Sequence, residues 1–220
     1  MVKKNKNIKN KTKITIIVIG ITIILLFLIL LIGVSIISDT QDLSNTQGNI
    51  EEQSNEYYVI ESNATDYQKE LYEKLSEQLN NEPNKVEIAK TVVQSFVADF
   101  YTWTNKDGSY DVGGLEYIYA SSLTNFNLAA REYFYNQLST YIDDYGKENL
   151  LEVTDVRVSG DYAPTSFVRD DVNLSTFYIE ASWDYKDSTV FDSSDYQKIA
   201  YFNVVINESG RFEIVNFIEG

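Results

Sequence analysis

Cysteine and histidine are both absent from this chain of 220 residues. Without them the protein cannot use a disulfide, a thiolate nucleophile, an imidazole base or a Ser-His-Asp triad, and the usual zinc ligands are missing. A lipid anchor attached to cysteine is excluded for the same reason. The fold must therefore be held together by its hydrophobic core, and we expect no cofactor and no metal site.

Charge is absent from the apolar run 14–37, in which Thr15, Thr22 and Ser35 are the only polar side chains. Because about 20 helical residues cross the hydrocarbon core of a bilayer, this run predicts a transmembrane helix. A cleaved signal peptide is the alternative interpretation. Its apolar region would be shorter and would end in a small-residue cleavage site, which the sequence lacks.

The orientation of the predicted span follows from its lysines. Six lysines lie in the basic tail 1–13, and the first charged residues after the span are Asp39 and Asp42. Lysine and arginine are retained on the cytoplasmic side of a membrane span. We therefore expect a single-pass protein of the cell membrane, with its N-terminus in the cytoplasm and its C-terminal domain outside.

Basic residues are scarce after residue 37. Six of the 18 basic residues precede that point, which leaves 12 against 33 acidic residues and a formal charge of −21 on the outer part. A surface that binds nucleic acid needs basic side chains to neutralise phosphate. We therefore expect no direct binding of nucleic acid.

Two segments precede the main domain. The polar run 38–63 has little apolar periodicity and predicts a flexible stalk. In the segment 64–82, Thr65 and Gln68 fit a capping box at a helix start, and Pro83 ends the helix. One apolar stripe runs along this helix, at Tyr67, Leu71, Leu75 and Leu79. The stripe could pack on the following domain or pair with another copy in a homo-oligomer.

Residues 84–220 show first helical and then strand periodicity. A second helix begins near Asn84, and its apolar face, at spacings of three and four, is wide enough to lie across a sheet. A third helix is predicted over about Asn125 to Tyr145.

After Gly146 the period changes to two, in the runs 151–158, 177–185, 198–206 and 212–218, and Asn207 to Gly210 predicts a hairpin link. Helices followed by about four antiparallel strands predict an α+β fold, with helices packed on a curved sheet.

This layout of anchor, stalk, helices and sheet resembles the cone-shaped α+β folds of the nuclear transport factor 2-like superfamily. With a cytoplasmic N-terminus and one span, the chain looks most like the bitopic assembly component of type IV secretion systems and its counterparts in Gram-positive conjugative elements. The resemblance covers about residues 84–220 and the anchor. It is one of layout, so no binding motif is carried over residue by residue, and the helix before Pro83 is an addition to the pattern.

The resemblance implies that a ligand pocket, if present, lies inside the cone. The aromatic residues on the second helix and just after it would line such a pocket: Phe96, Phe100, Tyr101 and Trp103. Aromatic residues at helical spacing are more commonly core, and core is our first interpretation. Asp99 lies near the edge of the apolar face, where we expect a solvated side chain. No second acid or base is identifiable near it in the sequence, so no catalytic residue is assigned.

Oxygen-bearing side chains alternate in the loop after this helix, at Asn105, Asp107, Ser109 and Asp111. This spacing is typical of the start of a calcium loop, but the glycine, Gly108, is at the fourth position instead of the sixth, and the closing glutamate is misplaced. We therefore predict an exposed turn, in which Gly113 and Gly114 redirect the chain.

Two functions fit these observations. The first is a non-enzymatic, membrane-anchored scaffold that contacts other membrane and channel proteins of a conjugative transfer apparatus. The second is a cell-surface binding or sensing module that holds a small apolar ligand in the cone. An enzyme that uses Asp99 is a weaker third hypothesis.

Overall fold

The computed structural model describes residues 53–81, 84–163, 166–169 and 172–220. These residues form an α+β fold of four helices and a four-stranded antiparallel sheet, which confirms the predicted class. The basic tail, the predicted span 14–37 and most of the predicted stalk lie outside the described residues. Among the described residues, no helix has the length and apolar character needed to cross a bilayer.

The sheet contains the four strands that the period of two predicted. β3 (Val153–Tyr162), β6 (Thr176–Tyr185), β7 (Ile199–Ile206) and β8 (Phe212–Glu219) lie side by side in that order, and each neighbouring pair is antiparallel. In β6, Phe177 and Ile179 are fully buried, whereas Tyr178 and Glu180, which alternate with them, are exposed. One face of the sheet therefore forms the core.

The link between β7 and β8 is the predicted hairpin turn. The Asn207 amide donates to the Arg211 carbonyl over 2.9 Å, and Gly210 adopts a φ of 90°, which favours glycine. A further hairpin, β4 (Phe167–Arg169) with β5 (Val172–Leu174), lies between β3 and β6 and was not predicted.

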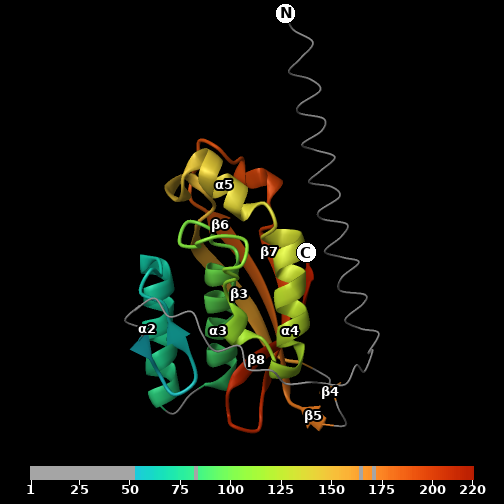
Figure 1. Ribbon diagram of the computed structural model, residues 1–220. Helices are drawn as coiled ribbons and strands as arrows, with labels where there is room; N and C mark the ends of the chain where they lie inside the picture. The colour runs from blue at the N-terminus through green and yellow to red at the C-terminus, as the bar shows by residue number, and fades with distance from the viewer. Residues whose placement is uncertain (1–52, 82–83, 164–165, 170–171) are drawn as a thin grey trace, which may run out of the picture.

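Helices cover one face of the sheet (Figure 1). α3 (Lys85–Phe100) contacts all four strands, and Asn84 caps its first turn by accepting from the Val86 amide. α2 (Asp66–Asn80) packs beside α3 and begins with the predicted capping box of Thr65 and Gln68. Figure 1 shows α3 between α2 and α4 in front of the strands.

The apolar stripe of α2 packs within the chain. Leu71 and Leu75 are buried, and Leu79 packs on the main core. The Tyr67 hydroxyl accepts a 2.8 Å hydrogen bond from the Val156 amide of the edge strand β3. Of the two alternatives for this stripe, the structure shows packing on the domain, so α2 and residues 84–220 share one core.

The third helix differs from its prediction in its start and in its continuity. α4 (Ala120–Ala129) begins earlier than expected, and a π-type turn, η2 (Ala130–Phe134), separates it from α5 (Leu138–Tyr145). The Tyr135 amide bonds to the Ala130 carbonyl, one residue further back than in an α-helix. This wider turn directs Tyr135 into the core, where its hydroxyl donates to the Phe100 carbonyl over 2.5 Å.

The end of the predicted stalk is part of the folded domain. β1 (Gln53–Ser54) pairs with β2 (Val59–Ile60), and Tyr58 is only 1% exposed. The Tyr58 ring stacks on Tyr117, and its hydroxyl donates to the Phe212 carbonyl over 2.8 Å. The expectation of a flexible stalk up to residue 63 is therefore wrong for its last residues, because a buried tyrosine fixes them to the core.

Candidate functional site

The four aromatic candidates lie together in the core between α3 and the sheet. Phe96, Phe100, Tyr101 and Trp103 are each at most 5% exposed. Phe100 stacks on Phe96 at 5.3 Å between ring centroids and on Phe134 at 4.9 Å. The Tyr101 ring lies 4.5 Å from that of Trp183. Ring-on-ring contacts of this kind stabilise a core, and these four side chains belong to the main core cluster.

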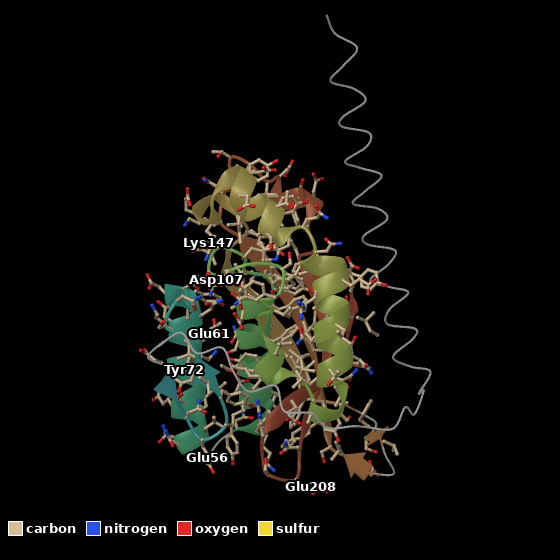
Figure 2. All side chains as sticks on the ribbon, in the orientation of Figure 1. Glu56, Glu61, Tyr72, Asp107, Lys147 and Glu208 are labelled. Atoms are coloured by element: carbon tan, nitrogen blue, oxygen red, sulfur yellow. The ribbon has the colours of Figure 1, made fainter. Side chains whose placement is uncertain are left out.

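A cavity of about 240 Å³ lies on the other side of α3. Its walls come from the segment around β2, from α2 and α3, and from the loop that leads into η1 (Leu115–Tyr117). Figure 2 shows Glu61 in the region between α2 and α3. The polar lining residues are Glu61, Gln68, Ser95, Asp99, Asn105, Glu116 and Tyr117. The aromatic residues Phe96, Phe100, Tyr101 and Trp103 do not line this cavity.

Asp99 forms an ion pair with a buried lysine. The Lys106 side chain is 1% exposed, and its Nζ lies 2.5 Å from Asp99 Oδ1. Burial lowers the pKa of Lys106, but the charge and hydrogen bond of Asp99 outweigh burial and raise that pKa overall. The expectation of a solvated Asp99 is wrong, because its side chain is only 28% exposed and holds this lysine in place.

Two glycines bring the η1 loop against α3. A Cβ on Gly113 would lie 2.4 Å from the Asp99 carbonyl oxygen, and Gly114 has a φ of 74°. The Gly114 amide donates to Asp99 Oδ2 over 2.6 Å. The predicted change of chain direction at these residues is confirmed, and its consequence is that Glu116 faces the same cavity as Asp99.

Glu116 titrates near neutral pH. Burial is the main cause that raises the pKa of Glu116 from 4.5 to about 7; the hydrogen bond from Tyr117 lowers the pKa, and the negative charge of Asp99 raises it. The Val59 amide donates to Glu116 Oε2 over a long 3.4 Å, and Arg211 donates to the Glu116 carbonyl. A carboxyl group with this pKa in a cavity can gain or lose a proton when a charged ligand binds.

Gln68 and Asn105 form a buried amide network. Gln68 Oε1 accepts from the Thr65 amide over 2.8 Å and from Asn105 Nδ2 over 3.0 Å, while Gln68 Nε2 donates to the Ala98 carbonyl over 2.9 Å. The capping glutamine of α2 thus positions Asn105 as well. Asn105 is 9% exposed, and its buried Oδ1 accepts no hydrogen bond from the described residues.

The rest of the predicted turn closes on itself. The Asp107 amide donates to Asp111 Oδ2 over 2.7 Å, and the Asp107 carboxylate pairs with Lys147; both residues are labelled in Figure 2. The Ser109 amide donates to Ser139 Oγ over 3.0 Å. Within the described ranges, no group of three or more acidic side chains is placed to hold a metal ion.

No protein-family model matches this chain, and neither a curated protein nor a solved structure matches it. Function is therefore inferred from the site itself. Sequence reasoning did not identify Lys106 as the ion-pair partner of Asp99, or Glu116 as a residue of the same cavity, because the fold of the loop brings them together. The cavity combines acidic side chains with an apolar wall formed by Val59, Ile60, Val112 and Leu115.

Proposed function

We propose that this chain is a membrane-anchored, non-enzymatic scaffold whose extracytoplasmic domain contacts other proteins of a conjugative, type IV secretion-like DNA-transfer apparatus. The six lysines before the apolar run 14–37 support the anchor and its orientation. The layout that resembles bitopic assembly components supports the class of apparatus. The filled aromatic core supports a domain that acts through its surface.

The observation that carries the proposal is an apolar patch on the outer face of the sheet, away from α3. This outer patch consists of Tyr178, Ile199, Tyr201 and Ile218. Tyr178 stacks on Tyr201 at 6.0 Å, and Ile199 and Ile218 are 42% and 54% exposed. Solvent-exposed aromatic and aliphatic residues that cluster on neighbouring strands are typical of a protein contact surface.

Another part of the same face is covered within the chain. Val205 and Val215 are buried by Leu174 of the β4–β5 hairpin and by Tyr119 and Phe167. On β7 and β8 the hydrogen-bonded pair Asn203 and Asn216 lies between this small cluster and the outer patch. We propose that an apolar segment of a partner protein covers the outer patch in the way that the hairpin covers Val205 and Val215.

The negative charge of the domain favours one kind of partner. The part of the chain after residue 37 carries a formal charge of −21, and Glu180 stands opposite Tyr201 beside the outer patch. Two copies that meet through this face would repel each other, whereas a partner with a basic rim around an apolar centre would be attracted. We therefore propose a basic channel protein as the occupant, and we place any self-association of the chain elsewhere.

The test is photo-cross-linking of the full-length protein in its native membrane, with the cross-linking residue at Tyr178 or Ile218. The expected product is an adduct with a channel subunit, secretion ATPase or lytic transglycosylase, and Ile218→Asp should abolish the adduct formed from Tyr178. Tyr110, which is 64% exposed and outside the outer patch, is the matched control position. Adducts with the chain itself only, or the same adducts from Tyr110, would refute the proposal.

A ligand-binding module is the second candidate, and the polar cavity favours it. The sequence suggested an apolar ligand among the aromatic residues of the cone. The cavity beside them is lined by acidic side chains instead, so a ligand of a different chemistry is required.

A further inference from the structure

Lys106 is held with its amine inside the protein. Its side chain is 1% exposed, and its Nζ lies 2.5 Å from Asp99 Oδ1. The turn after α3 fixes this position, because the Lys106 amide donates to the Trp103 carbonyl over 3.1 Å and the Trp103 amide donates to the Leu151 carbonyl over 2.7 Å. Lysine is almost never buried to this degree unless it is paired. An amine and a carboxyl group are therefore held in contact, away from bulk water.

The two carboxyl oxygens of Asp99 have different neighbours. Oδ1 contacts the Lys106 amine, whereas Oδ2 accepts a 2.6 Å hydrogen bond from the Gly114 amide. Gly113 allows this approach, since a Cβ there would lie 2.4 Å from the Asp99 carbonyl oxygen. A fixed backbone N–H of this kind stabilises the oxyanion that develops in acyl transfer. The carboxyl group thus presents one oxygen to a nucleophile and the other to an oxyanion donor.

The amine is also close to the carbon of this carboxyl group. Because a C–O bond is about 1.2 Å long, Nζ lies at most about 3.7 Å from Asp99 Cγ. Groups held at about 3–3.5 Å react as if one of them were present at about 10⁵–10⁸ M. The charged pair has lost much of its hydration through burial, which is unfavourable. A neutral product would remove that cost.

We propose that Lys106 and Asp99 become joined by an intramolecular amide bond, an isopeptide bond between Nζ and Cγ. The ammonium and the carboxylate together yield one amide and one water molecule, so the reaction needs no oxidant, reductant or external co-reactant. The first step passes one proton from Nζ to Oδ1 across their 2.5 Å contact. The lone pair of the neutral amine then forms the N–C bond, and Oδ2 takes the negative charge beside the Gly114 amide.

The breakdown of this intermediate completes the balance. A second proton moves from the nitrogen to Oδ1, the C–Oδ1 bond breaks with its electron pair on oxygen, and Oδ2 becomes the amide carbonyl oxygen. Oδ1 leaves as water with both protons. Asp99 lines the cavity and is 28% exposed, so the water has a way out.

Burial favours the reactive form of Lys106 once the first proton has moved. Burial is the largest influence on the pKa of Lys106 and lowers it, whereas the charge and hydrogen bond of Asp99, with smaller contributions from Glu61 and Asp111, raise it. Protonation of Asp99 removes the strongest of these opposing influences. The amine then stays neutral and nucleophilic beside the carboxyl carbon.

The bond would fasten the end of α3 to the loop that follows it. Its two residues are seven positions apart, and the chain has no cysteine with which a disulfide could make such a link. The proposal concerns the interior of the domain. It therefore does not depend on the proposed scaffold function or on the outer patch, and the cross-linking test at Tyr178 can fail independently.

The test is mass spectrometry of the full-length protein, extracted from its membrane in detergent, before and after digestion with trypsin. The intact mass should be lower than the sequence predicts by one water molecule. No basic residue lies between Lys90 and Lys106 or between Lys106 and Arg131. Because trypsin does not cleave after an acylated lysine, the linked chain should give peptide 91–131 lighter by one water. Peptide 91–106 at its full mass as the only product would overturn the proposal.

Two variants separate the bond from other losses of water. Lys106→Arg keeps a cation beside Asp99 and removes the amine, so the protein should have its full mass. Lys90→Arg is the matched control, because Lys90 pairs with Glu87 over 2.8 Å nearer the surface, and it should keep the loss of water. A loss that persists in Lys106→Arg would indicate a cyclic imide at Asp99 and would overturn the proposal. The peptide map of the wild type decides the matter even if Lys106→Arg does not fold.

The bond should also depend on the fold. The ion pair is the state before the reaction, so the linked fraction should rise with time in freshly prepared, folded protein. In denaturant the amine and the carboxyl group separate, and the linked fraction should stay constant. An equal rise in both conditions would show that the arrangement around Asp99 is not the cause, which would contradict the proposal.

Discussion

Two neighbouring stripes of α3 lie in opposite surroundings. Phe96 and Phe100, four residues apart, face the sheet among packed aromatic rings. Ser95 and Asp99, each one residue earlier, face the cavity beside α2 and η1. A step of one residue along one helix thus separates a packed aromatic core from a polar cavity. Burial alone does not describe these two surroundings; the partners of each side chain do.

The largest expected effect lies on the aromatic side. Phe100→Ala should lower the free energy of unfolding by about 3–5 kcal/mol, because it removes a buried ring and leaves a void. Denaturant unfolding of the full-length protein in detergent, followed by tryptophan fluorescence, measures it. Phe100→Leu should lower the free energy of unfolding by clearly less than Phe100→Ala does. A stable Phe100→Ala protein that only loses binding of an apolar ligand would restore the cone-pocket hypothesis.

Breaking the ion pair on the cavity side should have the next largest effect. Asp99→Asn removes the hydrogen-bonded counterion of the buried Lys106. This should cost about 3 kcal/mol, at the low end for such pairs, because Asp99 is partly exposed and the charges of Glu61 and Asp111 still act on Lys106. The same unfolding measurement applies. Adding Lys106→Met should recover part of the loss, and the absence of any recovery would show that the two side chains are not coupled.

Glu116→Gln should stabilise the domain at neutral pH. A carboxyl group whose pKa rises on folding binds its proton more tightly in the folded state, so the wild-type protein loses stability as pH rises from about 4.5 to about 7. The variant lacks this loss. Its free energy of unfolding, relative to that of the wild type, should therefore be about 1–3 kcal/mol higher at pH 8 than at pH 4. Unfolding at the two pH values measures it, and identical pH profiles would contradict the assignment.

The smallest expected effect concerns the edge of the sheet. Tyr67→Phe removes the hydroxyl that accepts from the Val156 amide and should cost about 1 kcal/mol. Tyr110→Phe, at an exposed tyrosine, is the control and should change stability by less than about 0.5 kcal/mol. If both variants behave alike, the hydroxyl of Tyr67 does not contribute to holding α2 on β3.

Local patterns predicted much of the fold. The capping box at Thr65, the start of α3 at Asn84 and the four strands each depend on residues close in sequence, so periodicity and turn chemistry found them. The π-type turn before Tyr135 was missed because it is fixed by a distant contact, the hydrogen bond to the Phe100 carbonyl. Tyr58 was missed for the same reason, since its partners Tyr117 and Phe212 lie far along the chain.

The candidate site was less predictable than the fold. Asp99 was recognised on the right helix, but its environment depends on Lys106 and on a loop that two glycines fold back against α3. Glu116 has no sequence signal, because its pKa depends on burial against elements from several parts of the chain. Asn105 was noted for its spacing in a calcium-like loop, whereas its function in the structure follows from its bond to Gln68.

The most direct test of the cavity side of α3 is a titration of the Glu116 carboxyl carbon by NMR. The titration midpoint should lie at about pH 7, because burial raises the pKa of this carboxyl group. A midpoint near the ordinary value of 4.5 would contradict the buried environment of Glu116 and its place beside Asp99.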